Sequence, residues 1–482
     1  MRSTTYLTAA ACAAALLAVT APAQAAPAAE VPAAKAAAKA APAKAADFNG
    51  DGYPDLAIGA PSAKIDGIKR AGLVSIVYGS ADGLKYDKQQ LVSRATPGVP
   101  GEPKANQYGW GIQASHGDLD GDGYDDLLVG DGPGMLVLWG GKDGISGGTE
   151  VPTGEGTTQS PAFRQAWQRI GDVNGDGKAD IVGAAQVGPQ TNANWGLGTL
   201  YGPFDRGTGK PASVQFRDTE AKDGVAATSA QVGDMTGDGI DDVVTMGTGR
   251  TPSDGWQARV LKGTRDGYVP GGKLDARHGG TFGDLNGDGY QDFVGTPQAS
   301  DVKNYGGISV TYGGPDGVSK TLHARVYDQD SPGVPGVNEK GDRWGTDVAV
   351  GDLDKDGYGD ILVGASWESA TDPATAVSGS VTMLRGSKAG VTTEGAKVLT
   401  QNSKGIPSTS EKSDHFGEAV TVVDADKNGA PEVYVGGMGE DTFVGRTWQL
   451  RTDATGVTGT SAKSFNLGGG YGSAHFGEYF AK

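Results

Sequence analysis

The chain has 482 residues, and its 82 Gly and 24 Pro make up about a fifth of them. This argues against an all-helical fold, because each Gly inside a helix costs about 1 kcal/mol relative to Ala, while 37% hydrophobic and 21% charged residues exclude a disordered chain. The net charge of −17 disfavours a general nucleic-acid-binding role, which needs a basic surface.

The N-terminal segment has the order of features of a secretory signal peptide. A basic residue precedes an apolar run (Leu7–Val19), and Ala23-Gln24-Ala25 follows as a small-x-small cleavage pattern. We therefore expect residues 1–25 to be a signal peptide, residues 26–46 to be an Ala/Pro/Lys-rich linker, and the mature protein to be secreted and extracellular. The only cysteine, Cys12, lies in the removed segment, so no disulfide or Cys-based zinc site is expected.

A nine-residue acidic loop, followed at once by a short apolar run, recurs along the rest of the chain. A run such as Leu56–Ile58 or Ile361–Val363 then ends in Gly, which is typical of a buried strand. The seven copies of the loop are Asp47–Asp55, Asp118–Asp126, Asp172–Asp180, Asp234–Asp242, Asp284–Asp292, Asp352–Asp360 and Asp424–Glu432.

Each copy opens a unit of several strands. A second apolar run, such as Val74–Tyr78, ends in an aromatic residue or Leu and a Gly turn in several units. A unit of this size cannot bury its own faces, so the units must stack or close into a ring. Radial closure of small sheets is a β-propeller. We predict an all-β, seven-bladed β-propeller over residues 47–482, with calcium loops in the blades.

The two ends of the predicted ring complement each other. The aromatic-Gly pairs at Trp110, Trp344 and Phe416 stand eight residues ahead of the first Asp of a loop. The first loop has only the linker before it, but a matching pair stands near the C-terminus at Phe476. We infer that residues 476–482 supply the strand that the first blade lacks and close the ring. Closure removes two exposed sheet edges, which would otherwise invite aggregation.

The acidic loop has the composition of a calcium site. Positions 1, 3 and 5 are Asp or Asn in nearly every copy, position 6 is Gly in all seven, and position 9 is acidic in all seven. Oxygen side chains at alternate positions of a tight loop converge, and Gly permits the positive φ of such a turn. Hard oxygen ligands without His or Cys favour Ca²⁺ over transition metals.

We therefore predict several Ca²⁺ ions, up to one per loop, with a backbone carbonyl at position 7 added by analogy with other calcium loops. The predicted ligands are Asp47, Asn49, Asp51, Tyr53, Asp55; Asp118, Asp120, Asp122, Tyr124, Asp126; Asp172, Asn174, Asp176, Lys178, Asp180; Asp234, Thr236, Asp238, Ile240, Asp242; Asp284, Asn286, Asp288, Tyr290, Asp292; Asp352, Asp354, Asp356, Tyr358, Asp360; and Asp424, Asp426, Asn428, Glu432.

The loop is not an EF-hand, which needs a bidentate Glu at position 12 and flanking helices. Position 12 is Ile58, Val129 and Val363 in three copies, already inside a strand, so the acid at position 9 takes that role. A single copy is equally explained by a solvated Asx-rich turn, but seven copies in one register favour calcium. Thr236 weakens the fourth site, and Asn428 leaves the seventh a candidate for a metal-free loop.

On these residues the chain resembles the FG-GAP repeat proteins, whose propeller is similar to the head domain of integrin α subunits. The resemblance covers residues 47–482, although no clear aromatic-Gly pair precedes the third, fourth and fifth loops. It implies that the calcium loops brace the blades, that ligands bind on other loops, and that the function is adhesion or recognition. The matching motifs are Trp344-Gly345 and Phe416-Gly417 for "FG", and Gly59-Ala60-Pro61, Gly183-Ala184-Ala185 and Gly364-Ala365-Ser366 for "GAP".

Two classes of function remain open. The first is a secreted module that binds an extracellular protein or glycan, and the alternative is a secreted hydrolase of the esterase or phosphodiesterase type with a site on one propeller face. Gly144–Gly148 fits a nucleophile motif by letter but lies at an ordinary turn of the repeat, and Gly267–Lys273 lacks the Ser or Thr of a phosphate loop. No catalytic residue is assigned, which favours the binding module. Neither a nucleic-acid partner nor a membrane span is expected.

Overall fold

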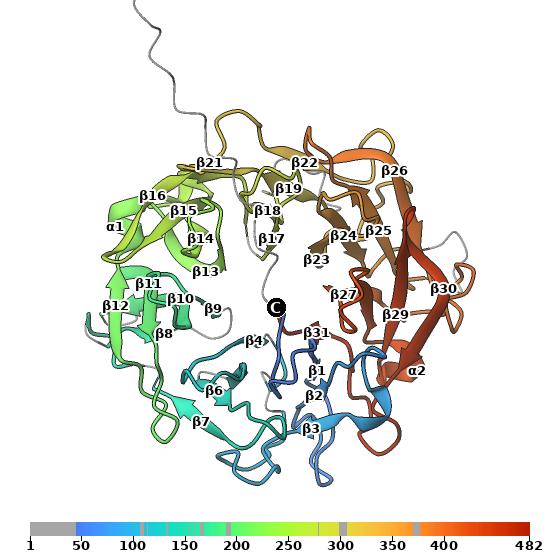
Figure 1. The fold of residues 1–482 in the computed structure, drawn as a ribbon, viewed down its shortest axis with the longest axis horizontal. Coiled ribbons are helices and arrows are strands. Elements are labelled where there is room, and N and C mark those ends of the chain that lie inside the picture. Colours follow the sequence, from blue (N-terminus) through green and yellow to red (C-terminus); the bar gives the residue numbers. More distant parts are fainter. Residues whose placement is uncertain are drawn as a thin grey trace, which may run out of the picture. The chain divides into compact units, whose positions relative to one another are not determined.

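The computed structural model describes residues 45–482, with gaps at 107–109, 113, 132–133, 153, 159, 164–167, 189–193, 278, 298–305 and 370–375. Within this part of the chain, seven antiparallel sheets are arranged in a ring (Figure 1). The all-β, seven-bladed β-propeller predicted from the repeats is confirmed. The blades are numbered below in the order of their acidic loops.

The strand nearest the centre of the ring is given first for each blade. Blade 1 contains β31 (Tyr479–Phe480), β1 (Leu56–Ala60), β2 (Leu73–Val77) and β3 (Gln90–Val92), and blade 2 contains β4 (Ala114–Gly117), β5 (Asp126–Asp131), β6 (Gly134–Leu138) and β7 (Gly148–Val151). Blade 3 contains β8 (Ala162–Phe163) with β9 (Arg169–Gly171), β10 (Asp180–Val187), β11 (Asn194–Tyr201) and β12 (Ser213–Arg217). Blade 4 contains β13 (Ala226–Gly233), β14 (Asp242–Thr248), β15 (Trp256–Thr264) and β16 (Gly267–Leu274). Blade 5 contains β17 (Thr281–Gly283), β18 (Asp292–Gly295), β19 (Ile308–Thr311) and β22 (Arg325–Tyr327). Blade 6 contains β23 (Val348–Gly351), β24 (Asp360–Ala365), β25 (Ser380–Arg385) and β26 (Thr392–Leu399). Blade 7 contains β27 (Phe416–Val423), β28 (Glu432–Gly437), β29 (Arg446–Asp453) and β30 (Gly456–Phe465).

The remaining elements of the described residues are short. A small hairpin lies between β19 and β22, and the helical segments span a single turn each. These elements are β20 (Gly313–Gly314), β21 (Gly317–Val318), α1 (Thr219–Asp223), α2 (Glu440–Phe443) and the 3₁₀ turns Tyr86–Lys88 and Pro252–Asp254.

Hydrophobic side chains are buried between neighbouring blades. The buried hydrophobic residues in the described part of the chain fall into seven clusters, and each cluster joins two adjacent blades. Ile58 lies in the cluster shared with blade 7, whereas its neighbour Ala57 lies in the cluster shared with blade 2, because successive side chains of a strand point to opposite faces. The second strand of a blade is therefore buried on both faces, which explains why the sequence after each loop is an unbroken apolar run.

The C-terminal strand closes the ring. β31 pairs antiparallel with β1, with Ile58 opposite Phe480, and the chain ends near the middle of the ring (Figure 1). Phe476 is fully buried and joins the cluster between blades 7 and 1. The backbone N–H of Lys482 donates to Ala114 of blade 2, and its Nζ contacts Asp347 next to β23 of blade 6. The inferred role of residues 476–482 as the missing strand of the first blade is confirmed.

Close contact between glycines of adjacent blades explains the two halves of the repeat motif. The carbonyl oxygen of the Gly in the aromatic-Gly pair of one blade lies against the backbone of the preceding blade. It contacts the Gly that starts the Gly-Ala-Pro-like segment there, and a Cβ on that Gly would clash with it. The pairs are Gly111 against Gly59, Gly417 against Gly364 and Gly477 against Gly436, with 2.0, 2.1 and 1.8 Å between the carbonyl oxygen and an added Cβ. Blade 3 differs, because Gly183 faces the side chain of Gln168.

Candidate metal centres

Each acidic loop precedes the second strand of its blade, and the loops of neighbouring blades are bonded to one another. In four junctions, the backbone N–H at position 8 of one loop donates to the carbonyl oxygen at position 1 of the loop before it. The bonds run from Asp125 to Asp47, Asp241 to Asp172, Gln291 to Asp234 and Gly359 to Asp284, at 3.0, 2.9, 3.1 and 2.8 Å. The loops therefore help to join adjacent blades as well as the strands within a blade.

The first Asp of every loop is held by the backbone of the turn. Its Oδ2 accepts the N–H of the position-6 Gly in all seven loops, and these glycines have the positive φ expected from the sequence, from 76° to 93°. The donors are Gly52, Gly123, Gly177, Gly239, Gly289, Gly357 and Gly429, at 2.8 to 3.1 Å. These bonds aim the position-1 carboxylate into the turn in the same way on every blade.

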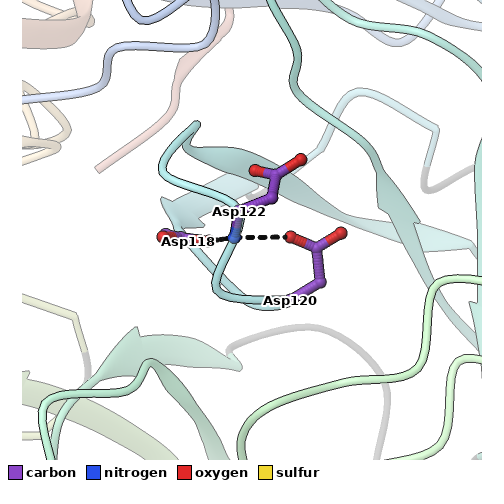
Figure 2. Close-up of side chains that lie close together, drawn as sticks. All are labelled: Asp118, Asp120 and Asp122. Atoms are coloured by element: carbon purple, nitrogen blue, oxygen red, sulfur yellow. Dashed lines mark hydrogen bonds between the residues drawn. The ribbon is translucent and has the colours of Figure 1, made fainter.

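The side chains at positions 3 and 5 lie beside the position-1 carboxylate. Figure 2 shows the second loop, in which the N–H of Asp122 donates to Oδ1 of Asp118 at 3.0 Å and to Oδ1 of Asp120 at 3.2 Å. One oxygen from each of these three carboxylates lies within 4.8 Å of the others, and the sixth loop repeats the arrangement with Asp352, Asp354 and Asp356. The other loops carry Asn or Thr at position 3, or Asn at position 5.

Several features of the loops fit a hard cation. Oδ1 of Asp47 and Oδ1 of Asp352 are buried without a hydrogen-bond partner, which is costly for a carboxylate unless a cation is bound. The second loop differs, because Arg206 of the neighbouring blade already supplies a positive charge there, pairing with Asp120 at 2.6 Å and with Asp122 at 2.8 Å. Carboxylate and amide oxygens on one tight turn match the ligand preference of Ca²⁺.

The position-9 acid has a structural role that the sequence did not reveal. In six blades one carboxylate oxygen accepts a backbone N–H within the loop, and the other accepts the N–H of a Gly at or just after the end of the third strand. In blade 3, Asp180 accepts from Val173 at 3.2 Å and from Gly202 at 2.9 Å. The corresponding residues are Asp55, Asp126, Asp180, Asp242, Asp292 and Asp360.

These position-9 carboxyl groups are almost completely buried. Burial, the largest cause, raises the pKa to about 7 for Asp55, Asp126, Asp180, Asp242 and Asp360, and well above its usual range for Asp292. In blade 7, Glu432 replaces this Asp and pairs with Arg451, and burial raises its pKa. The sequence held one indication of this role: position 9 is acidic in all seven copies, whereas the residues at positions 3 and 5 vary.

We expect the Asp180→Ala and Asp176→Ala variants to separate the two roles. Asp180→Ala leaves two buried N–H groups unpaired at about 1–3 kcal/mol each, so it should lower the free energy of unfolding with calcium and with chelator alike. Asp176, at position 5, accepts only from exposed backbone, so Asp176→Ala should destabilise the protein in calcium and have little effect in chelator. Urea unfolding of both variants in both buffers measures this. Equal behaviour of the two variants would contradict the distinction.

The structure thus brings the carboxylates at positions 1, 3 and 5 together in the second and sixth loops, and in six loops it bonds the position-9 carboxylate to backbone N–H groups. The position-7 residues Tyr53, Tyr124, Lys178, Ile240, Tyr290 and Tyr358 each donate their backbone N–H to the position-5 carboxylate. Thr236 of the fourth loop is buried and donates its N–H to Asp242. Calcium ligation by these residues stays a prediction.

Comparisons with known proteins match the repeats. Residues 41–77 and 344–382 match the FG-GAP repeat, and residues 118–183 match an FG-GAP-like repeat. The chain is 39% identical to integrin alpha-PS5 of Drosophila melanogaster over 93 residues, which are 19% of this chain and 8% of that protein. It is 27% identical to integrin alpha-V of Gallus gallus over 249 residues, 49% of this chain and 22% of that protein.

A third relative is the phosphatidylinositol-glycan-specific phospholipase D of Rattus norvegicus, 37% identical over 83 residues, which are 17% of this chain and 9% of that protein. The chain matches less than a quarter of the length of each of these relatives. Among the described residues, no helix is long and apolar enough to cross a membrane. The chain therefore contains FG-GAP repeats, has integrin alpha homologues over part of its length, and folds as a seven-bladed β-propeller.

Proposed function

We propose that this chain is a secreted, calcium-binding recognition or adhesion module that binds an extracellular protein or glycan. In this proposal residues 1–25 are the signal peptide, residues 26–46 the linker, and residues 47–482 the mature propeller. The order of basic, apolar and small residues at the N-terminus supports export, and the integrin alpha relatives support recognition as the function.

The observation that carries the proposal is the same carboxylate turn on all seven blades. Carboxylates that lie close together without a cation repel one another. Backbone N–H groups nevertheless hold the position-1 Asp side chain in the turn in every copy. A Ca²⁺ ion in the turn neutralises this charge. Since neighbouring loops are hydrogen-bonded to one another, the ion also stiffens the junction between blades and leaves the loops at the other ends of the strands for a ligand.

The second candidate, a secreted hydrolase, has less support. The phospholipase D relative is matched over 9% of its length, so the match carries no argument for that activity in this chain. No residue of the described part is assigned a catalytic role.

Binding of the purified mature chain to arrays of extracellular proteins and glycans tests the proposal. We expect binding in calcium that is lost in chelator and is weakened by Asp122→Ala, since that loop should no longer hold its ion. A parallel screen with ester, phosphodiester and glycoside substrates is the control. Turnover of one of these substrates together with no array binding would overturn the recognition module in favour of the hydrolase.

A further inference from the structure

Three of the connections between blades contain the same short turn, which we call the linker turn. A Thr or Ser begins it, a Gly follows two positions later, and a branched apolar residue and a Pro end it. In each copy the N–H of the branched residue donates to the carbonyl oxygen of the Thr or Ser at 3.0 to 3.1 Å, and the Gly has a positive φ. These are the features of a type II turn. The linker turns are Thr96–Pro100 before blade 2, Ser331–Pro335 before blade 6 and Ser403–Pro407 before blade 7.

Each linker turn fills the gap between the two blades that it connects. Its branched residue is 7 to 8% exposed and belongs to the hydrophobic cluster between those blades. The turn also lies against the outermost strand of the following blade. Gly148, which begins β7, donates its N–H to the carbonyl oxygen of Gly98 at 3.0 Å. Thr393 of β26 donates its hydroxyl to the carbonyl oxygen of Pro332 at 2.7 Å. The branched residues are Val99, Val334 and Ile406.

The connection from blade 7 to blade 1, which closes the ring, has no linker turn. β26 ends at Leu399, seventeen positions before Phe416 of the next blade. In contrast, β30 ends at Phe465, only eleven positions before Phe476. Residues 466–475 contain no Pro, Val or Ile. This connection therefore has no branched residue to fill the gap that a linker turn fills at the other three junctions.

A groove lies at this junction instead. Its volume is about 660 Å³, within the roughly 300–1,000 Å³ of typical ligand sites. Its wall includes Leu91 of β3, the outermost strand of blade 1, which is the strand that a linker turn would cover. Leu73 of β2 and Tyr471 add apolar surface, while Cβ atoms added at Gly469 and Gly470 would meet no other atom within 4 Å. The groove therefore has room for a turn where three other junctions hold one.

The groove lies at the end of blade 1 that is opposite to its acidic loop. That loop ends at Asp55, where β1 begins, whereas Lys64 in the groove wall belongs to the connection between β1 and β2. This connection carries three basic residues, Lys64, Lys69 and Arg70, and one acid, Asp66, which also lines the groove. Among the described residues, no carboxylate forms an ion pair with Lys64 or Lys69. The positive connection favours a ligand that carries a negative charge.

The neighbouring blades show where that charge should stand in a ligand. The residue two positions before a linker turn reaches the connection between the second and third strands of the following blade. Nε2 of Gln329 lies 2.6 Å from Oε2 of Glu368 in blade 6. In blade 7, Nε2 of Gln401 lies 2.5 Å from Oε2 of Glu440. The corresponding connection of blade 1 carries Lys64, so an acidic residue two positions before the turn suits this groove.

We propose that the groove between blades 7 and 1 binds a Ser/Thr-Pro-Gly-Val-Pro turn of an extracellular partner protein, with an acidic residue two positions before the Ser or Thr. This inference rests on the proposed recognition function and assigns it a class of ligand. The Val packs against Leu73 and Leu91, and the acidic residue pairs with Lys64. Pro and Gly favour the turn before binding, so little conformational entropy is lost when the groove is filled.

Fluorescence anisotropy with a labelled peptide tests the groove. The probe has the sequence of residues 328–336 with Gln329→Glu, and it is added to the purified chain in calcium. We expect saturable binding. It should weaken roughly tenfold or more when the peptide also carries Val334→Asp, because the apolar contact is lost. The peptide that keeps Gln329 should bind about two- to fivefold more weakly, because it lacks the pair with Lys64. A probe that does not bind saturably would overturn the proposal.

Two variants of the chain locate the binding. Gly469→Trp fills the groove with little risk to folding, because Gly469 does not have a positive φ and faces open space. It should abolish binding of the probe. Lys64→Glu should remove the preference for the acidic peptide. Ala81→Trp, in an exposed turn after β2, is the matched control and should bind like the unaltered chain. Equal affinity of Gly469→Trp and the unaltered chain for the probe would place the binding elsewhere and contradict the assignment.

Array binding separates this inference from the proposed function. Loss of the array ligands in Gly469→Trp, with an unchanged melting temperature, supports both. Array ligands that Gly469→Trp retains would keep the recognition function and overturn the groove as its site. Peptide binding without any array ligand would support the groove and count against the proposed function alone. Self-association of the chain that Gly469→Trp abolishes would make a second copy the occupant and overturn the assignment to a partner protein.

Discussion

Removal of residues 476–482 is expected to abolish the cooperative melting of the propeller or to lower its melting temperature sharply. The deletion takes away β31 and with it the side chains of Phe476 and Phe480, which are 0% and 5% exposed. Loss of one buried Phe side chain costs about 3–5 kcal/mol. Two such losses are comparable to the about 5–15 kcal/mol that stabilises a typical domain. The deletion also exposes the edge of β1, so aggregation should increase.

Thermal unfolding followed by circular dichroism, together with light scattering, measures this effect. Phe476→Ala should reproduce much of the loss, whereas Phe443→Ala is the control, because Phe443 is only partly buried and lies outside the clusters between blades. A deletion variant that melts like the intact chain would show that β31 does not close the ring.

Removal of calcium is expected to lower the melting temperature substantially. An ion that binds the folded state alone stabilises it by mass action, and several occupied loops add their contributions. Depletion also leaves the carboxylates of each turn to repel one another next to the junctions between blades. Melting with calcium, after depletion, and after calcium is restored measures the effect. Melting curves that coincide in all three states would remove the basis for calcium in the loops.

The effect of depletion should also depend on pH. Burial raises the pKa of five position-9 carboxyl groups, those of Asp55, Asp126, Asp180, Asp242 and Asp360, from the ordinary 3.8 to about 7 in the metal-free fold. Between these two values the folded state binds more protons than the unfolded state, so the stability of the depleted protein falls as pH rises through this window. Bound Ca²⁺ favours the ionised form and opposes this loss. The difference in melting temperature between the calcium-bound and depleted states should therefore grow from about pH 5 to about pH 7.

Local spacing was enough to predict the blades and the candidate loops. The acid at position 1, the Gly at position 6 and the apolar run after position 9 lie within a dozen residues, so the turn and strand follow from short-range sterics and hydrogen bonding. The C-terminal closure could also be predicted, because Phe476-Gly477 repeats a pattern whose partner is missing at the other end. The number of blades followed from the number of repeats.

The sequence did not predict the contacts that join residues far apart in the chain. Asp180 is an acid in a calcium-like pattern, but its hydrogen bond to Gly202 becomes visible only when the third strand is in place. The contact of Gly477 with Gly436 likewise depends on how two blades meet. No spacing rule relates such residues, because the chain between them is long and its path is decided by burial.

Composition and the repeating pattern by themselves determined an all-β ring of seven blades with an acidic turn on each. Only the tertiary structure decided which acids serve as buried hydrogen-bond acceptors, how adjacent loops are bonded, and that a groove lies beside Leu91 where blades 7 and 1 meet. The physical reason is that backbone turns depend on neighbouring residues, whereas the desolvation and pairing of charge depend on every segment that packs around a site.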